Sequence, residues 1–312
     1  MRAPGTREKL PGDLKIIGTR WVLTRRDDGR PRARLVVQGC QEKLQGIRVD
    51  SPTGSQESLQ LVLCDAAQRR WTLRQYDANA AYLQSEGLDR TLVLKMPNAT
   101  PTGVQPGALR VATGAIYGTR DAGRKWYLHF RAEMKRNGVC ESILEKGVYH
   151  VHVDGKLAAL IHTHVDDLLI AYSLDVPQLE AIWKQLEVRL NLTRTDGPEF
   201  TYLGRRIVLT WNTIEIDQVR AARNLDVQAL STTLRKQTEQ FCTPGEITDY
   251  KGMVGQLLWI SRHTRADLAL ATNLTAQRAA APTVRQYNEL VKLSLIHISE
   301  PTRQEAISYA VV

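Results

Sequence analysis

Residues 147–172 read GVYHVHVDGKLAALIHTHVDDLLIAY, and this stretch decides the fold class. Asp154-Gly155 has the chemistry of a two-residue hairpin turn, and Val165-Asp166-Asp167 is a tight polar interruption. Around these two turns, runs of apolar and β-branched residues predict strands over residues 147–153, 156–164 and 168–172. The stretch therefore predicts a meander of three strands.

The segments on either side of the meander differ in kind. Before it, the patterns predict a helical turn over 78–83, helices over 59–68 and 121–136, and strands over 16–24, 33–38, 71–77 and 92–96. After it come a helix over 177–190, strands over 200–210 and 213–216, and helices over 219–230, 249–261, 265–280 and 283–292. This order predicts an α+β lobe followed by a helical lobe.

The composition narrows the classes of protein. The 312 residues carry 42 Lys and Arg against 33 Asp and Glu, a net charge of +9, which suits a polyanionic partner such as nucleic acid. A hydrophobic content of 43% excludes a disordered chain.

No apolar run reaches the roughly 18–20 residues of a membrane helix, so no membrane partner is expected. Four widely spaced cysteines without a CxxC pair indicate reduced thiols and an intracellular protein, cytoplasmic or nuclear.

Three carboxylates follow or interrupt apolar strands. Asp166 and Asp167 are adjacent, so their charges repel, and Asp77 ends another predicted strand. A divalent cation removes this conflict, because Mg²⁺ prefers carboxylate oxygens. Three such groups meeting at one sheet edge could hold two Mg²⁺ ions about 3.5–4 Å apart, as phosphoryl transfer requires.

Each of these residues also has a plainer interpretation. Asp166-Asp167 is compatible with an ordinary hairpin turn, and Asp77 with a helix N-cap. His162-Thr-His164-Val-Asp166 also matches the opening of a zinc-hydrolase motif, although a strand places His162 and His164 on one face with or without metal.

Basic residues supply a separate pattern. Arg32 and Arg34 share one face of a predicted strand, where two guanidinium groups suit the oxygens of a triphosphate. Arg120, Arg124 and Lys125 could face a phosphate backbone. For any one of them, the alternative is a solvated surface charge.

Six blocks in order make the chain resemble the reverse transcriptase of copia-type LTR retrotransposons over about residues 15–292. The blocks are RARLVVQG (32–39), QYDANAAYL (75–83), AIYGTRDAGRKW (115–126), HVDDLLIA (164–171), FTYLG (200–204), and YKGMVGQLLW (250–259) with TRAD (264–267).

The resemblance implies a right-hand polymerase of fingers, palm and thumb, with an antiparallel palm sheet and a helical C-terminal lobe. It implies RNA-directed DNA polymerase activity with two Mg²⁺ ions (Mn²⁺ as a substitute), an RNA template, a DNA primer and dNTPs. Asp77, Asp166 and Asp167 match the metal ligands, and Tyr82 matches the side chain that excludes a ribose 2′-OH. Arg32, Arg34 and Asp121 match nucleotide-binding positions. Template and primer contacts fall on Arg120, Arg124, Lys125 and Trp126.

Departures from the family pattern bear on the alternatives. His164 replaces the usual Tyr, Asp121 replaces Gln, and Gly123 replaces Pro. A second hypothesis is therefore a decayed or co-opted, inactive nucleic-acid-binding remnant of the same fold, and the third is the zinc hydrolase. The expected domains are a loose lead-in (1–14), fingers and palm (15–217) and a thumb region (218–292). Residues 294–304 (SLIHISEPTRQ) look like a translated adapter sequence, so we expect residues 293–312 to be a non-native or disordered tail.

Overall fold

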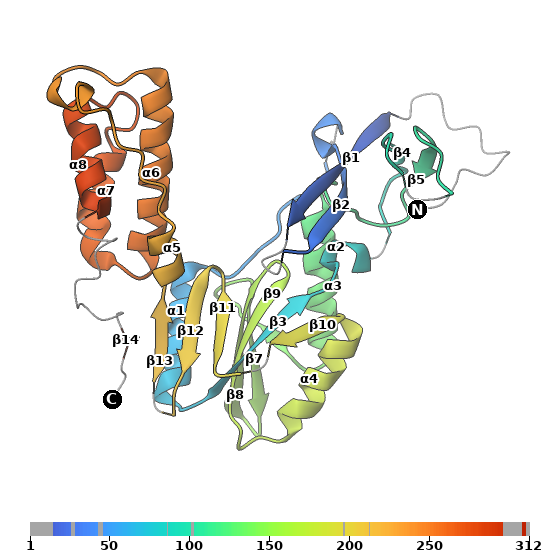
Figure 1. Ribbon diagram of the computed structural model, residues 1–312. Helices are drawn as coiled ribbons and strands as arrows, with labels where there is room; N and C mark the ends of the chain where they lie inside the picture. The colour runs from blue at the N-terminus through green and yellow to red at the C-terminus, as the bar shows by residue number, and fades with distance from the viewer. Residues whose placement is uncertain are drawn as a thin grey trace. The chain divides into compact units, whose positions relative to one another are not determined.

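The computed structural model describes residues 15–25, 29–42, 46–85, 87–100, 103–195, 197–211, 213–295 and 308–309. The chain divides into two compact units (Figure 1). The first unit contains the described residues up to Val62 together with Arg74–Thr195. The second contains Leu63–Leu73 and the described residues after Thr195. The predicted lead-in, residues 1–14, lies outside the described residues.

A six-stranded sheet forms the centre of the first unit. Its order is β10 (Leu192–Thr195), β3 (Thr72–Ala78), β9 (Asp167–Tyr172), β8 (Lys156–His164), β7 (Val148–Val153) and β6 (Cys140–Glu141). The predicted meander is confirmed, because β7, β8 and β9 pair antiparallel in sequence order. Asp154 and Gly155 have φ values of 51° and 74°, as expected for a type I′ hairpin turn.

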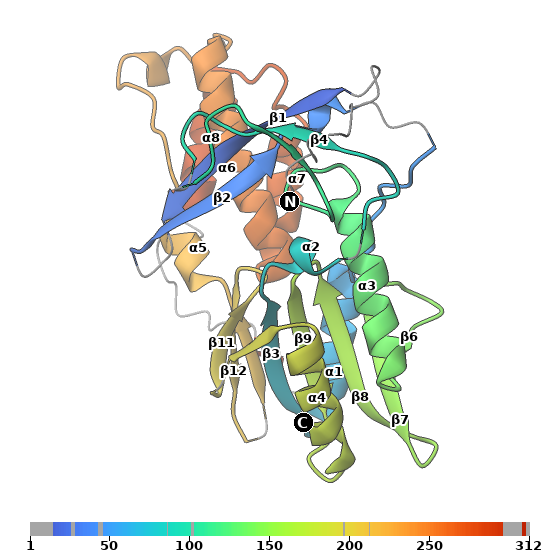
Figure 2. The same cartoon turned by 90° about the vertical axis from the view of Figure 1, so that its right-hand side faces the viewer.

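Two helices cover one face of this sheet, α3 (Ala122–Arg136) and α4 (Gln178–Arg189) (Figure 2). Trp126, Phe130 and Met134 lie on one line of α3 at i, i+4 and i+8, and all three are buried in the same core as Trp183 of α4. Burial of each such side chain contributes about 1.5–3 kcal/mol to folding. This core fixes α3 and α4 against the strands that carry the acidic residues.

A smaller sheet completes the first unit. Its order is β2 (Pro31–Val37), β1 (Ile16–Arg25), β4 (Val93–Lys95) and β5 (Leu109–Val111). The hairpin of β1 and β2 is confirmed, although residues 26–28 of its predicted turn lie outside the described residues. Two short elements lie in the connections, η1 (Gly39–Gln41) and α2 (Ala81–Gln84). The longer helix α1 (Gln56–Gln68) begins in the first unit, and its residues from Leu63 on belong to the second.

The second unit combines a small sheet with helices. The sheet order is β11 (Glu199–Tyr202), β12 (Arg205–Leu209), β13 (Ile214–Asp217) and β14 (Ser308–Tyr309). The helices are α5 (Val219–Arg223), η2 (Leu234–Lys236), α6 (Pro244–His263), η3 (Ala266–Leu268), α7 (Ala269–Ala276) and α8 (Val284–Ser294). Capping boxes at Thr243 and Thr283 begin α6 and α8. The side chain of each threonine accepts a hydrogen bond from the backbone N–H three residues later, and the side chain of that later residue accepts one from the threonine N–H.

The α+β fold class is confirmed, and two predicted elements are wrong. The strand predicted over 200–210 is the hairpin of β11 and β12, because Leu203 and Gly204 adopt φ values of 47° and 72° and reverse the chain. The helix predicted over 219–230 ends at Arg223. Beyond it, Leu225 and Val227 pack against the helical core from an irregular segment, so burial outweighs local helical preference there.

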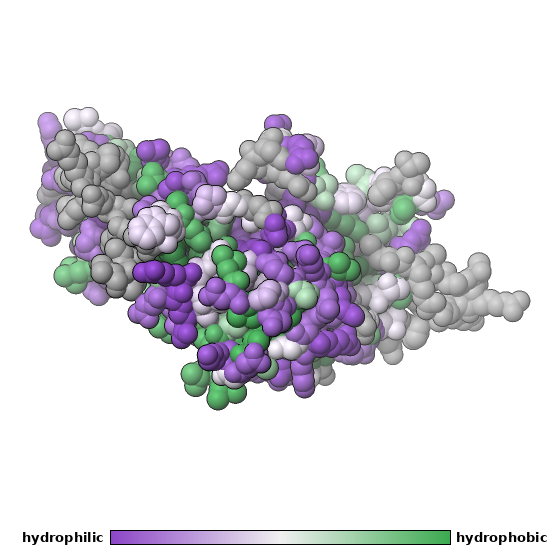
Figure 3. All heavy atoms as spheres, turned by 90° about the horizontal axis from the view of Figure 1, so that it is seen from below, coloured by the Kyte–Doolittle hydropathy of each residue, from purple (hydrophilic) through white to green (hydrophobic). Residues whose placement is uncertain are grey.

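The compact units divide after Thr195, so the division expected at residues 217/218 stays a prediction. Of the predicted tail, Leu293 and Ser294 end α8, and Ser308–Tyr309 pairs with β13. The other residues of that tail, apart from Leu295, lie outside the described residues. No described helix has the length and apolar content to cross a membrane. Hydrophilic side chains dominate the face shown in Figure 3, with apolar ones in small groups.

Candidate active site

The turn between β8 and β9 carries the adjacent carboxylates. His164 pairs with Asp167, which leaves Val165 and Asp166 as a two-residue loop. Val165 has a φ of 59°, and Asp166 does not share this left-handed conformation. A positive φ at the first loop residue alone is the pattern of a type II′ turn, in which glycine normally occupies that position. A β-branched residue in this conformation is strained by about 1–3 kcal/mol.

The third carboxylate lies at the same end of the neighbouring strand. β3 is hydrogen-bonded to β9, and the Ala78 N–H donates to the Asp166 carbonyl oxygen at 2.8 Å. Tyr76 and Ala78 are buried on one side of β3, so Asp77 between them projects to the opposite side. The structure thus brings Asp77 beside Asp166 and Asp167.

The electrostatics of these residues show that they act on one another. Burial, followed by the charges of Asp166 and Asp77, raises the pKa of Asp167 to about 6. Burial and the charge of Asp166 also raise the pKa of Asp77, whereas Arg32 and Arg34 act to lower it. Negative charge is therefore concentrated at this point, and it is only partly compensated by the two arginines.

The two arginines project from β2 close enough to affect Asp77. The Arg34 guanidinium lies over the ring of Tyr117, 5.6 Å from its centroid. Tyr117 in turn contacts Tyr82 of α2, with ring centroids 5.2 Å apart. Tyr82 packs against the same core as Val165 of the turn between β8 and β9, which we call the acidic turn, and burial and the charge of Asp166 raise the pKa of Tyr82. A line of contacting side chains therefore runs from Arg34 through Tyr117 to Tyr82.

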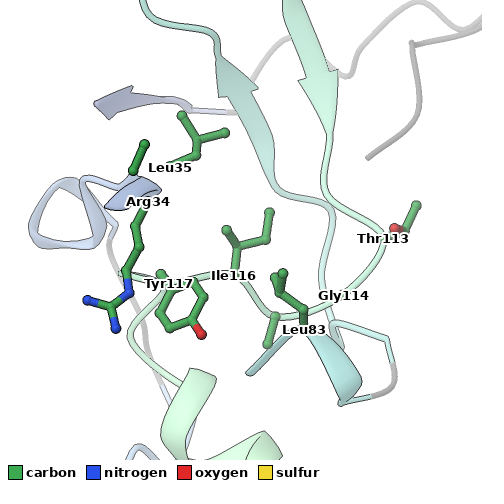
Figure 4. A pocket seen from close by; sticks show the side chains of 9 residues that line it. Arg34, Leu35, Leu83, Thr113, Gly114, Ile116 and Tyr117 are labelled. Atoms are coloured by element: carbon green, nitrogen blue, oxygen red, sulfur yellow. The ribbon is translucent and has the colours of Figure 1, made fainter. Parts of the chain in front are cut away.

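A cavity of about 440 Å³ adjoins this line. Figure 4 shows Arg34 beside Tyr117, with Leu83 and Ile116 nearby. Its walls are mainly apolar, with Arg34 as the charged member.

Asp121 is not available to a nucleotide in this structure. Its side chain is 1% exposed, and Arg90 Nη1 and Nη2 hold its carboxylate at 2.7 and 3.0 Å. Arg90 also donates to Glu42. In this structure the Asp121 carboxylate forms an internal ion pair with Arg90, which also pairs with Glu42, and the nucleotide contact expected of Asp121 stays a prediction.

Trp126, which was expected to contact the template and primer, is buried in this structure. It is 2% exposed, and its indole Nε1 donates to the Val165 carbonyl oxygen at 2.6 Å, so a template strand cannot reach it. The three basic residues near it remain at least partly accessible. Arg120 donates to the Glu42 carbonyl oxygen at 3.3 Å, Arg124 pairs with Asp50 at 3.0 Å, and Lys125 pairs with Asp89 at 2.5 Å.

The donor set of the acidic turn suits a hard cation, because it consists of carboxylate oxygens that repel one another. The described residues contain no group of three His, Cys, Asp or Glu side chains already arranged around one ion. The carboxylates would have to turn toward a shared cation. His162 is fully buried with Nε2 3.0 Å from the Ser55 carbonyl oxygen, so it serves packing rather than the zinc motif.

Reasoning from the sequence missed two features of the site, the partner of Asp121 and the partner of Trp126. Arg90 lies 31 residues before Asp121, and no local pattern links the two. The contact of Trp126 with Val165 spans 39 residues and involves a backbone atom, so the residue types do not reveal it.

Comparison with known proteins places the chain in a class. Residues 6–234 match the family model described as reverse transcriptase (RNA-dependent DNA polymerase), and the chain belongs to this family. It is 27% identical over 300 residues to the retrovirus-related Pol polyprotein from transposon RE2 of Arabidopsis thaliana, and 26% identical to that from transposon RE1. The corresponding protein from transposon TNT 1-94 of Nicotiana tabacum is 24% identical.

These matches cover 91%, 91% and 94% of this chain, in the same order. The chain spans about a fifth of the length of the two Arabidopsis relatives and 24% of the tobacco relative. The resemblance to copia-type elements is thereby confirmed.

Proposed function

We propose that this chain carries RNA-directed DNA polymerase activity, adding dNTPs to a DNA primer on an RNA template. The observation that carries the proposal is the meeting of Asp77, Asp166 and Asp167 at one end of adjacent strands, beside Arg32 and Arg34. Membership of the reverse transcriptase family supports it.

The roles follow from what each side chain can do. Asp77, Asp166 and Asp167 would hold two Mg²⁺ or Mn²⁺ ions, which supply a lowered pKa at the primer 3′-OH and neutralisation of the triphosphate. Arg32 and Arg34 bind triphosphate oxygens. The Tyr82 ring closes the space that a ribose 2′-OH would occupy.

Three further basic residues bind the nucleic acid. Arg120, Arg124 and Lys125 contact backbone phosphates, with Arg124 and Lys125 giving up their ion pairs to Asp50 and Asp89. We assign fingers and palm to residues 15–217 and the thumb to 218–292, in a right-hand layout.

The test compares Asp166→Asn with Asp154→Asn in extension of a DNA primer on an RNA template. Asp154 is the matched control, because it occupies the other turn of the same meander and its left-handed φ suits asparagine. D166N is expected to lose roughly a thousand-fold or more in rate, since removing a metal ligand forfeits several kcal/mol of transition-state stabilisation. D154N is expected to keep wild-type activity. Normal extension by D166N would contradict the proposal.

The inactive-remnant hypothesis gives a different result in the same experiment. Wild-type protein would then bind the RNA–DNA duplex, with log K falling linearly against log salt, but would incorporate no dNTP at any Mg²⁺ concentration. The Arg90–Asp121 ion pair weakens one argument for that hypothesis, because the Asp121 carboxylate has an internal cationic partner.

A further inference from the structure

We propose that Trp126 is a positioning residue for catalysis: its indole N–H holds the Val165 carbonyl oxygen and thereby fixes the turn that presents Asp166 and Asp167. The inference rests on the proposed polymerase function. It gives a specific role to a tryptophan of α3 that is 2% exposed.

Two hydrogen bonds hold consecutive carbonyl groups of the turn. Trp126 Nε1 donates to the Val165 oxygen at 2.6 Å, and the Ala78 N–H donates to the Asp166 oxygen at 2.8 Å. The first bond comes from α3 and the second from β3. Since each carbonyl oxygen is fixed from a different element, the peptide planes on both sides of Asp166 are oriented.

The turn needs such support because it is strained. Val165 occupies the position of a type II′ turn that favours glycine, and its φ is 59°. A strained residue persists only where its surroundings determine its conformation. The Val165 side chain also packs against the core that contains Trp126, so both the side chain and the carbonyl of this residue are held.

Trp126 is itself rigidly placed. Its ring packs against Phe130, with centroids 5.7 Å apart, and Phe130 meets Tyr149 of β7 edge-on at 5.6 Å. A buried indole N–H that lost its acceptor would carry a desolvation penalty, so the bond constrains both partners. The core of α3 and the sheet therefore sets where the carboxylates lie.

The chain offers a matched control in Trp183 of α4. Trp183 is buried in the same core at 1% exposure, and its Nε1 has no hydrogen-bond partner among the described residues. Trp126→Phe and Trp183→Phe remove the same atoms from the same core, but only the first removes a hydrogen bond to the turn. Both variants are expected to lower the melting temperature through lost packing, and W126F by more, because only it also removes a hydrogen bond.

The experiment measures steady-state dNTP incorporation by wild type, W126F, W183F, V165G and W126F/V165G. W126F is expected to lower kcat about tenfold with a smaller change in the KM for dNTP, and W183F to remain near wild type. Glycine adopts a positive φ without strain, so V165G in the W126F background is expected to restore most of the lost kcat. If W126F lowered kcat only through lost core packing, V165G would not restore it.

A second readout does not depend on activity. Backbone amides of residues 164–168 are expected to exchange faster with deuterium in W126F than in W183F. Equal kcat and equal exchange in the two variants, in a wild-type protein that incorporates dNTPs, would overturn the role of Trp126 alone. Absence of incorporation by wild type would overturn the proposed function, while the exchange comparison would still decide whether Trp126 holds the turn.

Discussion

Asp167 lies in an unfavourable electrostatic environment for a charged carboxylate. Its pKa is raised to about 6 by burial and by the neighbouring charges of Asp166 and Asp77. An acid whose pKa is higher in the folded than in the unfolded state opposes folding when it is ionised. At pH 7.5 the ionised Asp167 carboxylate therefore destabilises the metal-free protein.

Asp167→Asn is accordingly expected to raise the melting temperature of metal-free protein at pH 7.5 by about 2–4 °C. The gain should shrink as the pH falls through about 6 and be gone below about 4, where wild-type Asp167 is protonated in both states. In saturating Mg²⁺ the wild-type protein should have the higher melting temperature, because only wild type keeps all three ligands. Calorimetry with and without Mg²⁺ measures both melting temperatures. A lower melting temperature of metal-free D167N than of metal-free wild type would contradict the prediction.

Tyr82 is the second residue whose surroundings point to a specific role. Its ring lies against Tyr117 and near Asp166, so it borders the place where the sugar of an incoming nucleotide would lie under the proposed function.

Tyr82→Ala is expected to reduce discrimination between dCTP and CTP by about 10–100-fold, because the space of the ring becomes available to a 2′-OH. Tyr82→Phe keeps the ring and should keep the discrimination. The measurement is kcat/KM for each nucleotide on one template, and an unchanged ratio in Y82A would exclude Tyr82 as the sugar gate.

Among the elements, the end of β2 meets the loop before α3 through two glycines. The Val37 N–H donates to the Tyr117 carbonyl oxygen at 2.8 Å. A Cβ at Gly118, whose φ is 89°, would overlap the Val37 carbonyl oxygen, and a Cβ at Gly39 would overlap the Gly118 carbonyl oxygen. This close backbone approach puts Tyr117 within reach of Arg34.

Gly118→Ala is expected to lower the free energy of unfolding by about 2–4 kcal/mol, because backbone strain and steric overlap act together. Gly138→Ala is the control: its φ is 75°, but nothing lies within 4 Å of its added Cβ, so strain alone should cost about 1 kcal/mol. Urea titrations compare the two. Equal losses would show that the loop moves away from β2 at little cost.

Across the whole molecule, the positive charge and the acidic turn fit one proposed task. A net charge of +9 favours binding of a polyanion, while the negative charge concentrated at Asp77, Asp166 and Asp167 marks the place where cations would be needed. The two compact units differ in architecture. The first carries the acidic turn and both proposed triphosphate arginines, and the second is built from helices and a small sheet.

Strands and helices with strong local patterns could be predicted from the sequence. The meander of β7 to β9 and the apolar line of α3 are examples, because side-chain periodicity reports directly on a buried face. The hairpin at Leu203-Gly204 could not be read with the same ease, since its flanking residues look like one continuous strand. Short edge strands such as β5 and β6 gave too few residues for a pattern.

The sequence by itself determined the family and the α+β class, and it singled out the three aspartates as candidate metal ligands. Residue type, order and spacing are local quantities that the sequence states directly. Only the tertiary structure decided the places of Asp121 and Trp126. An ion pair to Arg90 and a hydrogen bond to the Val165 carbonyl join residues 31 and 39 positions apart, and such contacts depend on how elements pack rather than on which residues adjoin. Packing thus gives Asp121 and Trp126 internal partners that their residue types and spacing do not predict.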